Sequence, residues 1–142
     1  MRVEKNFELL KNISSVGIIL RPESPELKDV YQNIKDLFNK VNIDTLLEKE
    51  SAKMIDSDGF EFDDICKKVD FLISVGGDGT LLGVVRKSFK YNLPILGINL
   101  GTLGFLTDIS MNQLENFIVD LKKDIYKINT RMMIEGCINK NS

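Results

Sequence analysis

The stretch FLISVGGDGT, residues 71–80, joins an apolar run to a glycine-rich turn. Residues 71–75 have the composition of a strand that is buried on both faces. The turn contains three glycines, and the apolar positions that follow it, at Leu81, Leu82, Val84, Val85 and Phe89, predict a helix packed on a sheet. A strand–turn–helix unit of this kind is typical of a parallel α/β sheet, in which ligands bind beyond the carboxyl ends of the strands.

The residues before this unit predict further strands and helices. The run VGIIL at 16–20 has the composition of a second buried strand. Ser24-Pro25-Glu26 is typical of a helix start, since Ser suits the cap and Pro the first turn. The apolar spacing behind it, from Leu27 to Val41, predicts an amphipathic helix. We expect another strand at 43–47, a mobile turn-rich loop at 48–61 and a short helix at 63–68.

The residues after the unit continue the alternation of strand and helix. We expect a strand at 95–98, a second glycine-rich segment, GINLGTLGFLT at 97–107, and a helix around 114–121. Residues 126–138, YKINTRMMIEGCI, read as β structure without a clear partner strand. The prediction is therefore an α/β fold with an open, mostly parallel sheet and flanking helices over residues 1–125. Residues 126–142 are expected to begin a β-rich domain that is missing, so that the chain is an amino-terminal fragment.

Composition excludes several kinds of site. The chain has 142 residues, 43% of them apolar, and 19 basic against 21 acidic residues, a balance that argues against a nucleic-acid-binding face. It has no histidine, which excludes Ser-His-Asp and Cys-His catalysis and His-ligated zinc. Cys66 and Cys137 are expected to be reduced thiols. Without a signal peptide or an apolar run of the roughly 18 residues that a membrane span needs, we expect a cytoplasmic protein.

The turn at 76–80 has the properties of a phosphate site. Glycine permits positive φ and lets a phosphate approach the backbone closely, and the helix that follows offers free N–H groups. Asp78 suits a hydroxyl acceptor or a metal-linked group better than a phosphate ligand, because like charges repel. The alternative is a structural turn in which Asp78 only caps the helix. The sequence lacks a P-loop, and Leu82 stands where the dinucleotide fingerprint needs Gly or Ala.

The second glycine-rich segment strengthens this interpretation. Two such turns after consecutive strands are expected to lie side by side and leave a backbone-lined cleft. Asn99 either orients a ligand-binding loop or only stabilises it, and Phe105 either stacks on a base or belongs to the core. The pair Asp63-Asp64 is expected to be a solvated helix start rather than a metal site, and Arg131 a surface residue rather than part of the site.

The segments GGDGTLL at 76–82 and GINLGTLGFLT at 97–107 resemble the NAD kinase family, and the resemblance covers residues 16–136. The first motif is shared with diacylglycerol and sphingosine kinases and, more distantly, with phosphofructokinases; the second is more specific. The resemblance implies an amino-terminal α/β domain joined to a carboxy-terminal β-rich domain, with NAD bound between them. It further implies transfer of the terminal phosphoryl group of ATP, or of polyphosphate, to the 2′-hydroxyl of the adenosine ribose of NAD. Magnesium is the expected phosphate counter-ion, and NADP the product.

By the same resemblance, Asp78 is the catalytic proton acceptor, with Gly79 beside it on NAD. The turn from Gly76 through Gly77 to Thr80 handles phosphate, Phe105 lines the adenine pocket, and we count Asn99 with these nucleotide-binding residues; no residue is assigned to a metal.

Relatives continue with an Asn-Glu pair, whereas Asn139 and Asn141 are not followed by Glu. We therefore expect the chain to be inactive, or nearly so, on its own. The parent protein is expected to be a homo-oligomer, a dimer or tetramer, whose partners are small nucleotides rather than nucleic acid or membrane. A lipid-kinase-related phosphotransferase and a non-catalytic nucleotide-binding module are the two alternatives.

Overall fold

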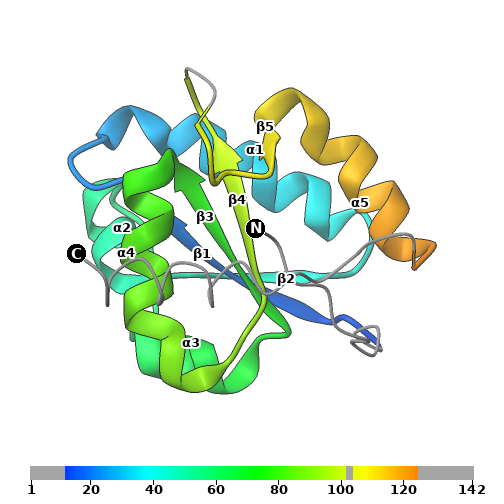
Figure 1. Ribbon diagram of the computed structural model, residues 1–142, viewed down its shortest axis with the longest axis horizontal. Helices are drawn as coiled ribbons and strands as arrows, with labels where there is room; N and C mark the ends of the chain where they lie inside the picture. The colour runs from blue at the N-terminus through cyan, green and yellow to red at the C-terminus, as the bar shows by residue number, and fades with distance from the viewer. Residues whose placement is uncertain (1–11, 102–103, 125–142) are drawn as a thin grey trace.

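The computed structural model describes residues 12–101 and 104–124. Its strands form one five-stranded sheet in the order β2-β1-β3-β4-β5, and every neighbouring pair is parallel (Figure 1). In chain order the elements are β1 (Ser15–Leu20), η1 (Pro25–Leu27), α1 (Lys28–Asn39), β2 (Asp44–Leu47), α2 (Lys49–Met54), α3 (Phe62–Lys68), β3 (Phe71–Gly76), α4 (Asp78–Ser88), η2 (Phe89–Tyr91), β4 (Ile95–Asn99), β5 (Ile109–Ser110), η3 (Met111–Gln113) and α5 (Leu114–Lys122). The predicted open parallel α/β sheet is confirmed.

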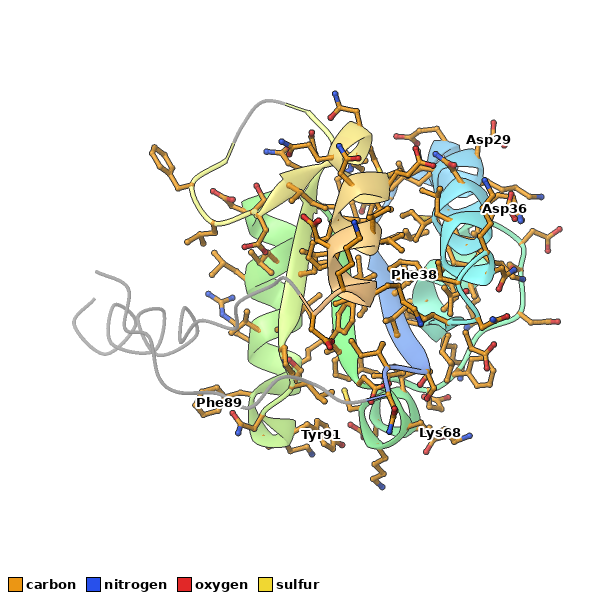
Figure 2. All side chains as sticks on the ribbon, turned by 90° about the vertical axis from the view of Figure 1, so that its right-hand side faces the viewer. Asp29, Asp36, Phe38, Lys68, Phe89 and Tyr91 are labelled. Carbon is orange, nitrogen blue, oxygen red and sulfur yellow. The ribbon has the colours of Figure 1, made fainter. Side chains whose placement is uncertain are left out.

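Helices cover both faces of this sheet. The larger core lies under α1, α2 and α5, and the smaller one under α3 and α4. Figure 2 shows the two faces of α1: Phe38 points toward the strands, whereas Asp29 and Asp36 lie on the outer face. Phe38 is fully buried. The three- and four-residue apolar spacing of the sequence therefore sets which face of α1 meets the sheet.

Gly17, in β1, allows α3 to pack close to the strands. A Cβ at this position would lie 2.8 Å from Leu72 Cδ2 and closer still to Ile65 Cγ2. Ile65 belongs to α3 and is fully buried, and Cβ atoms essentially never approach other heavy atoms so closely. Glycine at this position therefore sets the distance between α3 and the sheet.

The predicted mobile loop at 48–61 is wrong in its first half, which forms α2. Glu48 directly follows β2 and caps the helix, since its carboxylate accepts hydrogen bonds from the N–H groups of Glu50, at 2.6 Å, and Ser51, at 3.0 Å. Helix caps are usually Ser, Thr, Asp or Asn, so a Glu before the polar sequence KESAKM gave no recognisable start signal. The helix is held in place by the buried side chains of Ser51 and Ala52.

The predicted helix start at Ser24-Pro25-Glu26 is confirmed, since Ser24 is the N-cap residue of η1, but the Ser24 side chain makes no capping bond. Its hydroxyl instead accepts from Arg21 Nε at 2.7 Å and donates to the Pro22 carbonyl at 3.0 Å, so it stabilises the turn after β1. The short strand β5 has no counterpart among the sequence predictions, because two residues are too few to show a period. The β structure expected at 126–138 lies outside the described residues.

Candidate active site

The two glycine-rich segments meet at one edge of the sheet, as predicted. β3 and β4 are paired with Gly76 opposite Asn99, and the Leu100 N–H donates to the Gly76 carbonyl at 2.8 Å. The Asn99 side chain accepts from the Gly101 N–H at 2.8 Å and donates to Thr107 Oγ1 at 3.2 Å. These bonds stabilise the loop after β4 and fix the two turns relative to each other, and the assignment of Asn99 to nucleotide binding stays a prediction.

A cavity of about 990 Å³ opens beside this edge, within the 300–1,000 Å³ range typical of small-molecule sites. Five of the predicted site residues line it: Gly76, Gly77, Gly79, Thr80 and Asn99. The end of β1, the α2 region, the start of α3 and the first three turns of α4 provide the rest of the wall. The structure thus brings together the predicted phosphate-handling residues.

Sequence reasoning missed several lining residues, among them Arg21, Glu48, Met54, Phe62 and Lys87. Arg21 had a usable signal, because it directly follows a buried strand and so lies at the carboxyl edge where ligands bind. The others come from α2, α3 and the far part of α4, whose positions around the cavity depend on helix packing.

Glycine serves two purposes in the turn. At Gly76 an added Cβ would lie 2.9 Å from Thr80 Cβ and 3.1 Å from Arg21 Cβ, so the fold itself requires glycine there. At Gly77 and Gly79, by contrast, no described atom lies within 4 Å of an added Cβ. The expected positive φ is wrong: among the described residues no glycine has one, and Gly77 is extended with φ −144°. Gly77 and Gly79 therefore leave open space along the backbone at the cavity wall.

Asp78 is not among the residues that line the cavity, and its side chain is bonded to the loop that follows β4. Its carboxylate accepts hydrogen bonds from the backbone N–H groups of Phe105, at 2.9 Å, and Leu106, at 3.0 Å, and is also bonded by that of Thr107. Partial burial raises the pKa of Asp78, but the three N–H groups together outweigh it and hold this pKa below its ordinary value. The cap of α4 is Gly77 without a side-chain bond, so the interpretation of Asp78 as a helix cap is wrong.

The same contact places Phe105 at the surface. Its side chain is completely exposed, so the interpretation as a core residue is wrong. The backbone of this loop passes close to the carboxylate at Gly104, where an added Cβ would lie only 2.8 Å from Asp78 Cγ. The Asp78 carboxylate and the loop that carries the exposed Phe105 are thus joined at the amino-terminus of α4.

Two cationic side chains line the cavity among the described residues. Arg21 lines the cavity with its Cβ beside Gly76, and its guanidinium donates to Ser24 and, at 3.2 Å, to Glu26. The Lys87 ammonium lies 4.7 Å from the centroid of the Phe62 ring, a cation–π contact. Together with the free N–H groups at the start of α4, Arg21 supplies the positive potential that a phosphate needs.

The remaining predicted features lie elsewhere. Asp63 and Asp64 stand in the first turn of α3, as expected, and Asp63 accepts from the Tyr91 hydroxyl at 2.6 Å. Cys66 is a buried free thiol, and burial raises its pKa to about 11. Arg131 and Cys137 lie outside the described residues. Within the described ranges no helix is long and apolar enough to cross a membrane.

An open parallel sheet with helices on both faces and a glycine-walled cavity at its carboxyl edge defines the doubly wound α/β class, whose members bind ligands at that edge. Comparison with known proteins narrows this class. The model of the ATP-NAD kinase N-terminal domain matches residues 16–126. An NAD kinase of Sulfurimonas denitrificans is 48% identical over 92% of this chain and 46% of its own length, and one of Wolinella succinogenes is 46% identical over 89% and 44%. The chain belongs to the NAD kinase family.

A solved structure shows the same fold. Yeast NADH kinase, crystallised with NADH, superposes with a TM-score of 0.71 at 20% identity, over 89% of this chain and 45% of that one. The chain therefore spans about half the length of the curated relatives and of this structural neighbour.

Proposed function

We propose that this chain carries the phosphate-handling half of an NAD kinase. The reaction is transfer of the terminal phosphoryl group of ATP, or of polyphosphate, to the 2′-hydroxyl of the adenosine ribose of NAD, giving NADP. One observation carries the proposal: Gly77 and Gly79 line the cavity, while the carboxylate of Asp78 between them is held by the loop after β4 at the same end of α4. A phosphate and a hydroxyl can therefore both be positioned at this end of α4, and positioning is the main contribution of an enzyme to phosphoryl transfer.

The cavity side suits the donor. Gly77 and Gly79 leave their backbone open, so phosphate oxygens can reach the N–H groups at the start of α4. Arg21 adds a guanidinium at the same place, with the fork geometry that matches phosphate. Magnesium would enter on the phosphates of the donor, where it neutralises charge, since the described residues contain no group of three Asp, Glu, Cys or His that could hold a metal ion.

The Asp78 side suits the acceptor. A carboxylate has about four acceptor positions, and three backbone N–H groups occupy three of them, which leaves one for a ribose hydroxyl. A carboxylate with a lowered pKa is a weak base, but in a loose transition state the hydroxyl proton can leave late. The exposed ring of Phe105, on the loop that Asp78 holds, is available to stack on adenine.

We also propose that residues 126–142 belong to a second, β-rich domain that completes the NAD site. The family match ends at residue 126, and the relatives are about twice as long, which supports this division. Activity then needs both domains, and the 142-residue chain alone is inactive or nearly so. Assembly into dimers or tetramers and a cytoplasmic location stay predictions.

A fusion tests the proposal. The chain is joined after residue 142 to the second half of the Sulfurimonas denitrificans relative, and NADP is measured with an NADP-specific dehydrogenase. We expect the fusion to form NADP from ATP and NAD, and the unfused chain to form little or none. A fusion that folds but yields no NADP argues against an NAD kinase, and an unfused chain as fast as the fusion argues against the second domain.

The variant Asp78→Asn in the fusion separates catalysis from structure. Its amide turns one acceptor into a donor that faces the backbone N–H groups, yet its volume is unchanged. We expect turnover to fall at least about a hundredfold, the range of a lost acid–base group, while NAD still binds. Loss of thermal stability alone, with turnover retained per folded molecule, would favour the non-catalytic module.

A further inference from the structure

Thr107 contacts both Asp78 and β4, although it is not among the residues that line the cavity. Its backbone N–H donates to the Asp78 carboxylate, and its Oγ1 accepts from Asn99 Nδ2 at 3.2 Å. Its Cα lies so close to β4 that a Cβ added to Gly97 would be only 3.2 Å away. A single residue thus links the start of α4 to the end of β4.

The Asn99 side chain ties the two ends of this loop together. Its Oδ1 accepts from the Gly101 N–H at 2.8 Å near the start of the loop, while its Nδ2 donates to Thr107 near the end. Asn99 is itself held firmly, because it is the last residue of β4, lies opposite Gly76 of β3 and is only 5% exposed. At a buried position water does not replace a lost hydrogen bond, so the bond from Asn99 to Thr107 fixes the geometry of the loop.

Asp108 attaches the next residue of the loop to the same strand. Its carboxylate accepts from the Gly97 N–H at 2.8 Å, and its own N–H donates to the Gly97 carbonyl at 2.8 Å. Residues 107 and 108 are therefore bonded to β4 at two neighbouring points. The rigid sheet thus determines where the N–H groups of the preceding residues lie.

The direction of the Asp78 side chain depends on these N–H groups. Asp78 is the first residue of α4, and among the described residues the donors to its carboxylate all belong to the loop, at residues 105–107. A side chain at a helix start has several staggered rotamers, and the loop selects one of them. Transfer chemistry is sensitive to this choice, because misplacement of a group by about 1 Å can cost about a hundredfold in rate.

We propose that Thr107 and Asn99 are positioning residues, whose side-chain bond holds the loop on Asp78 and so directs the Asp78 carboxylate toward the acceptor hydroxyl. In this role neither residue touches the reacting atoms. The inference rests on the proposed function, in which Asp78 accepts the proton of a ribose hydroxyl. It adds that the acid at the start of α4 is oriented from β4.

An isosteric substitution tests the bond in the 142-residue chain. Thr107→Val keeps the backbone N–H and the branched shape beside Gly97, and removes the hydroxyl that accepts from Asn99. We expect the loop to bind Asp78 less well, so that the pKa of Asp78 rises from its lowered value, as measured by NMR titration of the carboxyl group. Thr107→Ser retains the hydroxyl and should restore the parent pKa.

Thr45→Val is the matched control. Thr45 lies in β2, at the opposite edge of the sheet from β5, and its Oγ1 is buried without a partner among the described residues. The same chemical change should there leave the pKa of Asp78 unaltered. Asn99→Ala removes the proposed bond from its other end and should also raise this pKa. Adding Thr107→Val to Asn99→Ala should then raise it little further, because both substitutions remove the same interaction.

Kinetics of the fusion separate positioning from stability. Thr107→Val should lower kcat for NADP formation at least about tenfold, because a misdirected acid slows the chemical step. The KM for ATP should stay within about twofold of the parent value, since Thr107 does not line the cavity. Thr107→Ser should recover most of the turnover, and Thr45→Val should retain all of it.

Three results overturn the proposal. The first is a parent-like pKa of Asp78 in both Thr107→Val and Asn99→Ala, even if their melting temperatures fall. The second is a Thr107→Ser variant as impaired as Thr107→Val, since the hydroxyl then has no part. The third is a raised pKa with kcat unchanged. If instead the pKa rises, serine restores it and the parent fusion makes no NADP, the orientation of Asp78 from β4 stands and the kinase assignment falls.

Discussion

Replacing glycine by alanine at two positions should change stability in opposite directions. Gly83 lies in the interior of α4 and has open space where a Cβ would be. The substitution Gly83→Ala therefore gains the helix preference of alanine, about 0.8–1.0 kcal/mol, without a steric cost. For a domain of this size that gain corresponds to a rise of roughly 3–6 °C in the melting temperature.

Gly17→Ala makes the same chemical change where there is no room. The new methyl group would lie 2.8 Å from Leu72 Cδ2 and closer to Ile65 Cγ2, inside a fully buried contact. Overpacking of this kind costs about 1–3 kcal/mol, so the melting temperature should fall. Thermal unfolding followed by circular dichroism compares the two variants with the parent chain. If Gly83→Ala is less stable than the parent, the space at α4 is not open and the cavity is wrongly described.

Three further predictions concern titratable groups. In Gly104→Ala the new Cβ would clash with the Asp78 carboxylate, so the backbone N–H bonds to this carboxylate should weaken. The pKa of Asp78, which these bonds hold below its ordinary value, should therefore rise. An NMR pH titration of the carboxyl group measures this pKa, and an unchanged midpoint contradicts the contact. Burial raises the pKa of Cys66 to about 11, so little of this thiol is the reactive thiolate at pH 8. Iodoacetamide should therefore label Cys66 slowly in the native chain and rapidly after unfolding. Equal rates in the two states would show an exposed thiol. The hydroxyl of Tyr91 donates to Asp63, which raises the pKa of Tyr91 to about 12. The hydrogen bond therefore stabilises the fold below the unfolded pKa near 10, and this stabilisation is lost as pH rises through 12. Ultraviolet titration of the phenol, with Tyr91→Phe as control, should show this late midpoint.

Much of the fold follows from local sequence pattern. The apolar runs at 16–20 and 71–75 became central strands because strands buried on both faces need continuous apolar composition. Since the strands are parallel, the two glycine-rich segments had to lie at one edge, and Gly76 opposite Asn99 confirms this. Helix α2 was not predictable in this way, because Glu48 is an unusual cap and the helix is held by tertiary contacts of Ser51.

The candidate site was predictable only in part. The glycine pattern identified Gly77 and Gly79 as places of close backbone approach, although the reason is open space and not positive φ. The bonds from the backbone of Phe105 and Leu106 to Asp78 cross 27 and 28 residues of sequence, and no local pattern encodes such a contact. Phe62 also reaches the cavity through packing that only the assembled helices define.

The Asp78 carboxylate accepts hydrogen bonds from the backbone of the loop and not from its side chains. Any amino acid except proline offers the same N–H group, so the identities at Phe105 and Leu106 can be exchanged without releasing the acid. A library randomised at these two positions would vary the surface offered to a heterocycle while the carboxylate stays anchored. The fold therefore separates the proposed proton acceptor, Asp78, from the side chains proposed to contact the base.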